Sequence, residues 1–491
     1  MPKRTAIIDI GSNSARLVIY EQSSRFGFRL ICEQKSKVRI GEGAYNNGGL
    51  LQPVGIKRAY NTLSSFKQTI ENYKTYKIIC VATSALRDAP NANDFIQLIK
   101  NDLKLDIKVI DGKKEAYYGG IAALNLLTKK DAVTVDIGGG SSDMTLIKNG
   151  KIEDTFSLDI GTVRLKELFS DDNTSIEDAK KFIRKELTKL PQSFGLDTIV
   201  AIGGSARTIA NIIIQTSDYP LNKLHGFKYE LDEYNEFLDK IVTSDIEALG
   251  AFEISPDRYD TIREGILILL EIAKHVKAKH IITSGVGVRE GVFLTQFLKN
   301  SDLKFPNNIN PSMQNILDRF NSPMGAKLAA QKRQAIKRLA EIFSTNFTIK
   351  KIFLTELQNA ITMSEIGKNL TIYKAHKHSF YIALEELNYG YTHKQMILTA
   401  LLLIVGRKAK IKQSVYKKFK SILPGKNTLK WHVFLYSITL SIFEFSDDAK
   451  IRFEFNNMTL FIISDKPLYL LKEVLRDIEK PADFEIVIKD N

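Results

Sequence analysis

The chain has 491 residues, of which 44% are hydrophobic and 26% charged, a composition typical of a soluble globular protein with about two to four domains. Its 2 cysteines exclude a disulfide scaffold and a cysteine-based zinc site. The net charge of +14 is uneven: residues 301–491 hold 29 Lys+Arg against 18 Asp+Glu, and the first 300 residues are nearly balanced. This excess suits a polyanionic partner such as nucleic acid, polyphosphate or a membrane surface, and equally serves solubility.

The beginning of the chain, MPKRTAIIDI, enters a predicted strand without an apolar leader segment or a small-residue cleavage site. The longest apolar run, near Ile397–Val405, is too short to cross a bilayer and lies in a helical pattern. We therefore expect a cytoplasmic protein with no membrane span.

Strand and helix patterns alternate through the first 300 residues, which predicts α/β layers. The predicted strands are Thr5–Ile10, Ile78–Ala82, Ile107–Ile110, Ala132–Asp136, Thr198–Ile202 and His280–Thr283. The predicted helices are Pro53–Tyr73, Asn93–Lys100, Lys114–Leu127, Ile176–Leu190 and Asp260–Val276.

The proline- and asparagine-rich segment Lys304–Pro311 predicts a domain boundary, and residues 312–430 have an almost wholly helical pattern. A further change of pattern at Trp431 predicts a small α+β tail over residues 431–491. Its predicted elements are strands at Phe434–Phe445, Lys450–Phe455, Thr459–Ser464 and Phe484–Lys489, and a helix at Tyr469–Ile478.

One weak repeat links Asp9–Ser14 (DIGSNS) with Asp136–Ser141 (DIGGGS). Each segment lies between two apolar stretches, so each predicts a strand, a tight polar turn and a second strand. We therefore expect two lobes of similar design, each presenting one hairpin turn to a shared cleft.

The segment Asp136–Asp143 (DIGGGSSD) could bind phosphate and a metal. Glycines in a turn leave successive backbone N–H groups open to phosphate oxygens. Asp136 at the strand end can hold Mg²⁺ directly or through water, and Asp143 across the turn can face the same ion. The alternatives are a Gly-rich hairpin with a solvated acid and, for Asp9–Ser14, an ordinary Asx-type turn. The candidate phosphate-binding turn residues are Asp9, Gly11, Ser12, Asn13, Ser14, Gly138, Gly139, Gly140 and Ser141.

Four further segments contain candidate residues. Arg87 could bind phosphate bidentately or pair with Asp88 or Asp94 on the surface. Glu115 in a first helical turn either complements the helix dipole or orients an attacking water as a general base. Strand–glycine–helix turns, which favour phosphate, occur at Gly203, Gly204 and Ser205 and again at Ser284–Gly291. The chain has neither a GxGxxG dinucleotide motif nor a P-loop, which excludes those two nucleotide sites.

These segments resemble, in order, the motifs of the exopolyphosphatase/guanosine pentaphosphate phosphohydrolase (Ppx/GppA) family. The motifs that carry the resemblance are Asp9–Arg16, Val81–Asn91, Gly112–Gly120, Val135–Asp143, Gly161–Leu165, Ile202–Thr208 and Ser284–Phe293. The resemblance implies an α/β, actin-like ATPase fold of two ribonuclease-H-like lobes, expected at residues 1–124 and 125–303, with Mg²⁺ as cofactor.

Matched by position, Glu115 corresponds to the family's catalytic base and Asp136 to its metal- or water-positioning carboxylate. Asp143 stands where the family commonly has glutamate, so an ion there would sit differently or bind through water. We take Glu115, Asp136 and Asp143 as the catalytic residues, and Asp9, Asp136 and Asp143 as the metal ligands.

In the C-terminal region, Leu354–Arg407 is similar to the helical HD-like domain of the long family members, expected here at residues 304–430. Ser364-Glu365 replaces the His-Asp pair of the metal-binding version, so we expect no hydrolytic metal site there, and His376 and His378 as surface or interface residues. Arg407–Lys430 contains nine Lys/Arg and no acid. These residues form either a solvated helix face or a polyanion track, whose candidate members are Arg407, Lys408, Lys410, Lys412, Lys417, Lys418 and Lys420.

The expected function is Mg²⁺-dependent release of terminal orthophosphate from inorganic polyphosphate, with hydrolysis of guanosine pentaphosphate to the tetraphosphate as a second activity. The alternatives are an actin-like-fold kinase and a non-catalytic polyphosphate- or RNA-binding protein. Nucleic acid is a secondary partner in this interpretation, and the family implies a homodimer.

Overall fold

The structure is a computed structural model that describes residues 3–44, 47–170, 175–320, 325–406, 409–444 and 449–490. It divides into two compact units, Met1–Pro311 and Ser312–Asn491. Among the described residues, no helix combines the length and the apolar character needed to cross a membrane.

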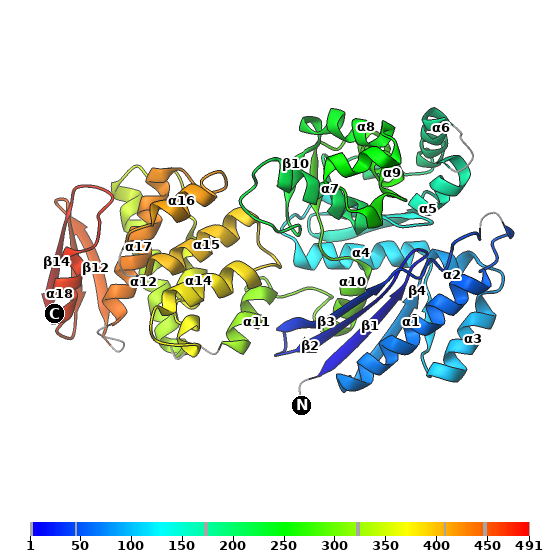
Figure 1. The fold of residues 1–491 in the computed structure, drawn as a ribbon. Helices are drawn as coiled ribbons and strands as arrows, with labels where there is room; N and C mark the ends of the chain where they lie inside the picture. Colours follow the sequence, from blue (N-terminus) through cyan, green and yellow to red (C-terminus); the bar gives the residue numbers. More distant parts are fainter. Residues whose placement is uncertain are drawn as a thin grey trace. The chain divides into compact units, whose positions relative to one another are not determined.

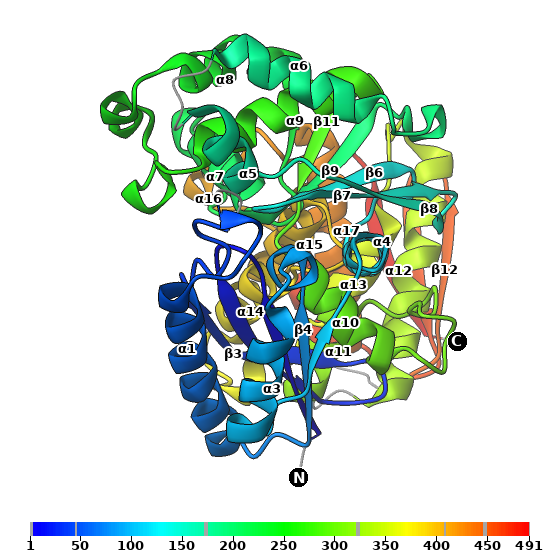
Figure 2. The same ribbon diagram turned by 90° about the vertical axis from the view of Figure 1, so that its right-hand side faces the viewer.

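The first unit begins with a mixed sheet of order β3-β2-β1-β4-β5. Its strands are β1 (Arg4–Ile10), β2 (Ala15–Gln22), β3 (Phe28–Ser36), β4 (Lys77–Ala82) and β5 (Ile107–Val109). Helices α1 (Pro53–Asn72) and α3 (Ala92–Leu103) cover one face (Figures 1 and 2). Proline at the first position of α1 suits a helix start, and Ala59, Leu63, Phe66 and Ile70 recur at the spacing of one buried stripe.

A second mixed sheet of the same unit has the order β8-β7-β6-β9-β11-β10. Its strands are β6 (Ala132–Ile137), β7 (Ser142–Lys148), β8 (Lys151–Leu158), β9 (Thr198–Ile202), β10 (Lys228–Glu230) and β11 (His280–Thr283). In both sheets an antiparallel hairpin opens the sequence and its first strand pairs in parallel with the next strand of the core. The predicted hairpins at Asp9–Ser14 and Asp136–Ser141 are therefore confirmed.

The remaining principal helices of the second sheet surround a continuous apolar core. They are α6 (Ile176–Leu187), α7 (Gly203–Thr216), α8 (Asn235–Thr243) and α9 (Ile262–Val276). Short helices α2 (Ser84–Asp88) and α5 (Thr162–Leu165) follow strand ends near the two hairpin turns.

Two helices, α4 (Gly112–Leu126) and α10 (Val288–Phe297), lie between the two sheets (Figure 1). Helix α4 packs on β6, β7 and β8, while α10 packs on α4 and β1. The expected limit between the lobes 1–124 and 125–303 falls inside α4, and α10, expected in the second lobe, packs on β1 of the first sheet. The order of elements along the chain does not indicate this arrangement, because it depends on contacts between residues far apart in the sequence.

The second unit is helical and ends in a small sheet of order β12-β13-β14. Its helices are α11 (Pro311–Arg319), α12 (Ala326–Asn346), α13 (Leu354–Thr362), α14 (Ala375–Glu386), α15 (His393–Val405), α16 (Gln413–Phe419), α17 (Lys426–Glu444) and α18 (Tyr469–Arg476). The strands are β12 (Ile451–Asn456), β13 (Thr459–Ser464) and β14 (Glu485–Asp490), close to three of the predicted strands.

The strand predicted at Phe434–Phe445 is wrong over residues 434–444, which continue α17, and Phe445 lies outside the described residues. The expected boundary between residues 430 and 431 falls inside that helix. The segment is rich in β-branched and aromatic residues, and a continuous apolar run does not distinguish a buried strand from a buried helix. Helix α17 is enclosed on most sides: Trp431 and Phe434 lie 5.2 and 5.5 Å, between ring centroids, from Phe343 of α12. A helix that is apolar all round is a buried one.

Candidate functional site

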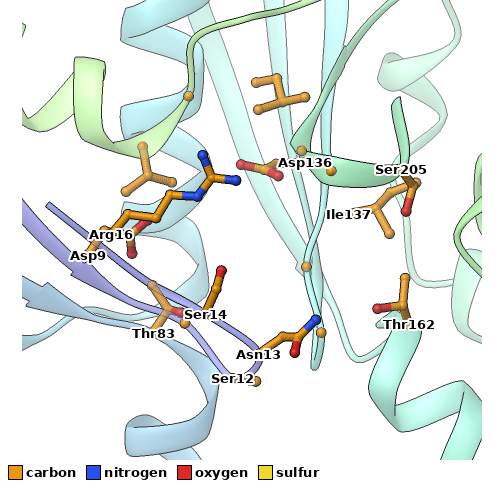
Figure 3. A pocket seen from close by; sticks show the side chains of 18 of the residues that line it. Asp9, Ser12, Asn13, Ser14, Arg16, Thr83, Asp136, Ile137, Thr162 and Ser205 are labelled. Carbon is orange, nitrogen blue, oxygen red and sulfur yellow. The ribbon is translucent and has the colours of Figure 1, made fainter. Parts of the chain in front are cut away.

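The two hairpin turns face one pocket between the sheets of the first unit, with a volume of about 180 Å³ (Figure 3). The turns are built alike: the Gly11 N–H donates to the Ser14 carbonyl at 3.1 Å, and the Gly138 N–H donates to the Ser141 carbonyl at 2.9 Å. The predicted residues that line the pocket are Asp9, Gly11, Ser12, Asn13, Ser14, Glu115, Asp136, Gly138, Gly139, Ser141, Gly203, Gly204 and Ser205. The structure thus brings together residues from several segments far apart in the chain.

The N-terminus of α7 forms a third wall of the pocket. Gly203 has φ +98°, a conformation that favours glycine, and a Cβ there would lie 3.0 Å from Asp136 Oδ1. Glycine therefore lets the start of a 14-residue helix approach the carboxylate closely. Free backbone N–H groups at a helix start favour an anion such as phosphate.

Asp136 and Asp9 lie on the first strands of their hairpins and both line the pocket. Burial raises the pKa of Asp136 to about 6, although the Arg207 guanidinium acts in the opposite direction. Burial also raises the pKa of Asp9, against the influence of Arg289 and Arg16. Figure 3 shows Arg16 extending from the first sheet towards Asp136.

Glu115 lies in the first turn of α4, where the Asp111 carboxylate caps the helix by accepting the Lys114 N–H at 2.7 Å. Burial raises the pKa of Glu115 well above its usual range, and the carboxylates of Asp143 and Asp136 raise it further. A pocket carboxylate whose pKa is moved towards neutrality suits proton transfer.

Three of the predicted catalytic and phosphate-binding residues, Arg87, Gly140 and Asp143, do not line the pocket. Arg87 Nη1 donates to the Ile110 carbonyl at 3.2 Å and lies 3.5 Å from Glu115 Oε2, so it contacts the candidate base and not the pocket space. The phosphate-binding role expected for Arg87 is thus not supported by its position.

Asp143 is 2% exposed and both its oxygens have partners. Oδ1 accepts the Ser157 hydroxyl at 2.5 Å, and Oδ2 accepts the Ser141 hydroxyl at 3.2 Å. Burial raises its pKa to about 7. Asp143 does not line the pocket and both its oxygens accept hydroxyl groups, so direct metal ligation does not fit this geometry, and the expected ligation through water stays a prediction.

The pocket also contains six cationic side chains that the sequence analysis did not assign to it: Arg16, Lys35, Lys37, Arg207, Arg258 and Arg289. Arg207 and Arg289 belong to the glycine turns already identified, and Arg207 follows Gly203 by about one helical turn, which brings it back to the same end of α7. The spacing between Gly203 and Arg207 is therefore the sequence signal that could have placed Arg207 in the pocket. Arg258 and the two lysines come from segments without a motif.

The fit of a metal ion rests on Asp9 and Asp136. Mg²⁺ is usually held by one or two carboxylates together with waters and substrate phosphates, and these two carboxylates in a phosphate-sized pocket meet that pattern. Within the described parts of the chain, there is no group of three or more His, Cys, Asp or Glu side chains that could hold a metal by themselves.

In the predicted polyanion track, Arg407 and Lys408 lie outside the described residues. Lys410, Lys412, Lys417, Lys418 and Lys420 are all exposed, and Phe419 between them is buried. On α12, Lys332 is 3% exposed and lies 3.5 Å from Glu365.

Residues 18–300 match the model of the Ppx/GppA phosphatase family. The chain is 32% identical over 300 residues to a bifunctional 3-dehydroquinate synthase/phosphatase of Fusobacterium nucleatum, covering 57% of this chain and 44% of that protein. It is 27% identical over 413 residues to a guanosine-5'-triphosphate,3'-diphosphate pyrophosphatase of Pseudoalteromonas translucida, covering 80% of this chain and 79% of that one. The chain therefore spans under half the length of the first relative.

Among solved structures, the Ppx/GppA family member of Aquifex aeolicus is 30% identical with a TM-score of 0.53, over 61% of this chain and 99% of that one. An exopolyphosphatase of Cytophaga hutchinsonii, 23% identical with a TM-score of 0.56 over 62% of this chain and 100% of that one, shares the fold. Both structures match a part of this chain with nearly their whole length.

Proposed function

Because the chain belongs to the Ppx/GppA phosphatase family, we propose that it releases terminal orthophosphate from inorganic polyphosphate and also hydrolyses guanosine pentaphosphate to the tetraphosphate. The observation that carries this proposal is the pocket itself. Phosphate-binding turns from both sheets, six cationic side chains and the base candidate Glu115 line one space.

The terminal phosphates of the substrate enter between the two hairpin turns. Backbone N–H groups of the turns and of the α7 N-terminus, with the guanidinium groups of Arg16, Arg207 and Arg289, balance charge on the phosphoryl oxygens. Such preorganised donors stabilise the transition state because they need no rearrangement as charge redistributes.

Glu115 orients the attacking water and takes its proton, which leaves orthophosphate and a chain shorter by one phosphate. Its raised pKa makes the carboxylate a stronger base than an exposed glutamate. Arg87 and Asp143 do not line the pocket, but both act on Glu115. Arg87 contacts its carboxylate, and the negative charge of Asp143 raises its pKa.

Asp9 and Asp136 would hold Mg²⁺. When bound, the ion would neutralise phosphoryl oxygens of the substrate. The protein's own contribution is to fix the two carboxylates at the ends of their hairpin strands, with Gly203 giving the space beside Asp136.

The repeated strand order of the two sheets supports placing the first unit in the actin-like class, with two ribonuclease-H-like lobes. That class also includes kinases, so a phosphotransferase is the rival enzyme. The exposed lysines of the second unit support a long polyanion as substrate.

The test measures phosphate release from polyphosphate and from guanosine pentaphosphate, with Mg²⁺ and no acceptor. We expect Glu115→Ala to lower kcat by about 10²- to 10⁴-fold, the contribution of general-base catalysis. Glu71→Ala, at an exposed glutamate of α1, is the control and should retain full activity. Turnover that requires an added acceptor would identify a kinase, and binding without turnover would identify a non-catalytic polyanion-binding protein.

A further inference from the structure

Glu290 lies in the first turn of α10 and both of its carboxylate oxygens have partners. Oε1 accepts the Tyr20 hydroxyl at 2.5 Å, and Oε2 accepts the Gly287 backbone N–H at 2.7 Å. The residue is 5% exposed. The bond to Gly287 alone is an ordinary helix cap, but a cap does not require the second bond to Tyr20.

The two partners of Glu290 belong to segments of different sheets in the first unit. Tyr20 is on β2 of the first sheet and 1% exposed; its ring stacks on Phe293 at 4.4 Å between centroids and meets Phe28 edge-to-face at 5.8 Å. Gly287 belongs to the loop after β11 of the second sheet and lines the pocket. The carboxylate therefore bridges the first sheet and a wall that the second sheet provides.

The bridged wall adjoins the candidate reacting groups. A Cβ added at Gly287 would lie 3.6 Å from Asp136 Oδ2 and 2.9 Å from Ile202 Cγ2, so the backbone is seated directly beside the carboxylate. Two residues further on, Arg289 lines the pocket and donates to Glu33 of β3 at 2.9 Å. A shift of this segment would move both the backbone beside Asp136 and a pocket guanidinium.

We propose that Glu290 is a positioning residue: through Tyr20 and Gly287 it sets the pocket wall beside Asp136 relative to the sheet that carries Asp9. Its effect on turnover rests on the proposed function. Glu290 itself does not line the pocket, and its oxygens accept from Tyr20 and Gly287. A misplacement of about 1 Å in such a wall costs about a hundredfold in rate.

Three variants test the bridge. Glu290→Ala removes both bonds and should lower kcat about a hundredfold with little change in KM. Glu290→Gln retains an acceptor for Gly287 and an amide donor for the Tyr20 oxygen, so it should restore most of kcat. Tyr20→Phe should lower kcat in the same direction, and combining it with Glu290→Ala should add nothing further, since the pair acts as one unit.

Glu271 of α9 provides the matched control. It is 7% exposed and accepts two bonds from Arg184, at 2.6 and 2.9 Å, but does not line the pocket. Glu271→Ala should lower the free energy of unfolding and leave kcat unchanged. If Glu290→Ala lowers only the free energy of unfolding and leaves kcat at the Glu271→Ala value, the positioning role is overturned.

Hydrogen exchange of the Gly287 amide separates this inference from the proposed function, because it needs no turnover. Tyr20→Phe should accelerate that exchange if the bridge holds the wall, whereas a simple helix cap predicts no change. Wild-type protein without phosphatase activity, together with accelerated exchange in Tyr20→Phe, would overturn the proposed function and support the bridge. An active wild type with unchanged exchange in Tyr20→Phe would overturn the bridge alone.

Discussion

His225 contacts the pocket loop from behind, and its two ring nitrogens both have backbone partners. Nδ1 accepts the Gly285 N–H at 3.1 Å, so the other nitrogen, Nε2, donates to the Leu126 carbonyl at 3.0 Å. This pattern is satisfied only by the neutral ring, because a proton on Nδ1 would face the Gly285 N–H. Burial accordingly lowers the pKa of His225 below its usual range.

At the residue scale we therefore predict a pH effect on stability. Below about pH 6.5 the unfolded histidine binds a proton that the folded one does not, so the free energy of unfolding falls as the pH falls, by up to about 1.4 kcal/mol per pH unit. His225→Gln should flatten this slope between about pH 6.5 and 5.5. Urea unfolding at both pH values measures it, with His275→Gln at an exposed site of α9 as control. An equal slope in His225→Gln and wild type would contradict the assignment.

At the scale of elements, the crossing of α4 and α10 joins the two sheets. A Cβ on Gly291 would lie 1.9 Å from the Tyr118 carbonyl oxygen, a backbone atom that no side-chain rotation can relieve. The helices are therefore in backbone contact at this glycine. The stacked aromatic rings of Tyr20 and Phe293 continue the contact onto the first sheet.

We predict that Gly291→Ala forces the two helices apart and lowers the free energy of unfolding by about 1–3 kcal/mol, the usual cost of overpacking. Gly325→Ala, at the start of α12, is the control: a Cβ there has no neighbour within 4 Å, and we expect a change within about 0.5 kcal/mol. Denaturant unfolding compares the two. Equal effects would show that the crossing tolerates a methyl group.

At the scale of the whole molecule, the positive charge has two separate locations. One is the pocket of the first unit, where six cations accompany the carboxylates. The other is the exposed lysine set of the second unit around α16. The Aquifex aeolicus relative matches 99% of its length to 61% of this chain, so a family member exists with little beyond the first unit.

We predict that the second location affects long substrates. Replacing Lys417, Lys418 and Lys420 by glutamine should raise KM for long-chain polyphosphate more than for short-chain polyphosphate. The slope of log KM against log salt should fall by about one unit for each substrate phosphate that these lysines no longer neutralise. The control replaces Lys100, Lys104 and Lys108, three exposed lysines of the first unit, by glutamine, which removes the same number of charges. An equal rise in KM for both chain lengths would contradict a guiding role.

The sequence by itself determined most of the strands and helices of the first unit and the residues that form the two pocket turns. Glycine and small polar residues between two apolar runs favour a hairpin turn. The segments DIGSNS and DIGGGS therefore predicted the two hairpins without knowledge of any tertiary contact. Asp136 was a candidate from its place at a strand end, whereas the choice of Glu115 as base over a helix-dipole role rested on the resemblance to the family's motifs.

Only the tertiary structure decided which of these side chains meet. Asp143 and Arg87 were both predicted as site residues, yet their side chains do not line the pocket. Asp143 accepts from Ser157 and Ser141, and Arg87 donates to the Ile110 carbonyl. Three further features depend on contacts between residues far apart in the chain. They are the packing of α4 and α10 between the sheets, the helical conformation of α17 and the position of Arg258 in the pocket. Local patterns report the conformation of a segment, whereas burial against distant segments sets which face, which sheet and which pocket it joins.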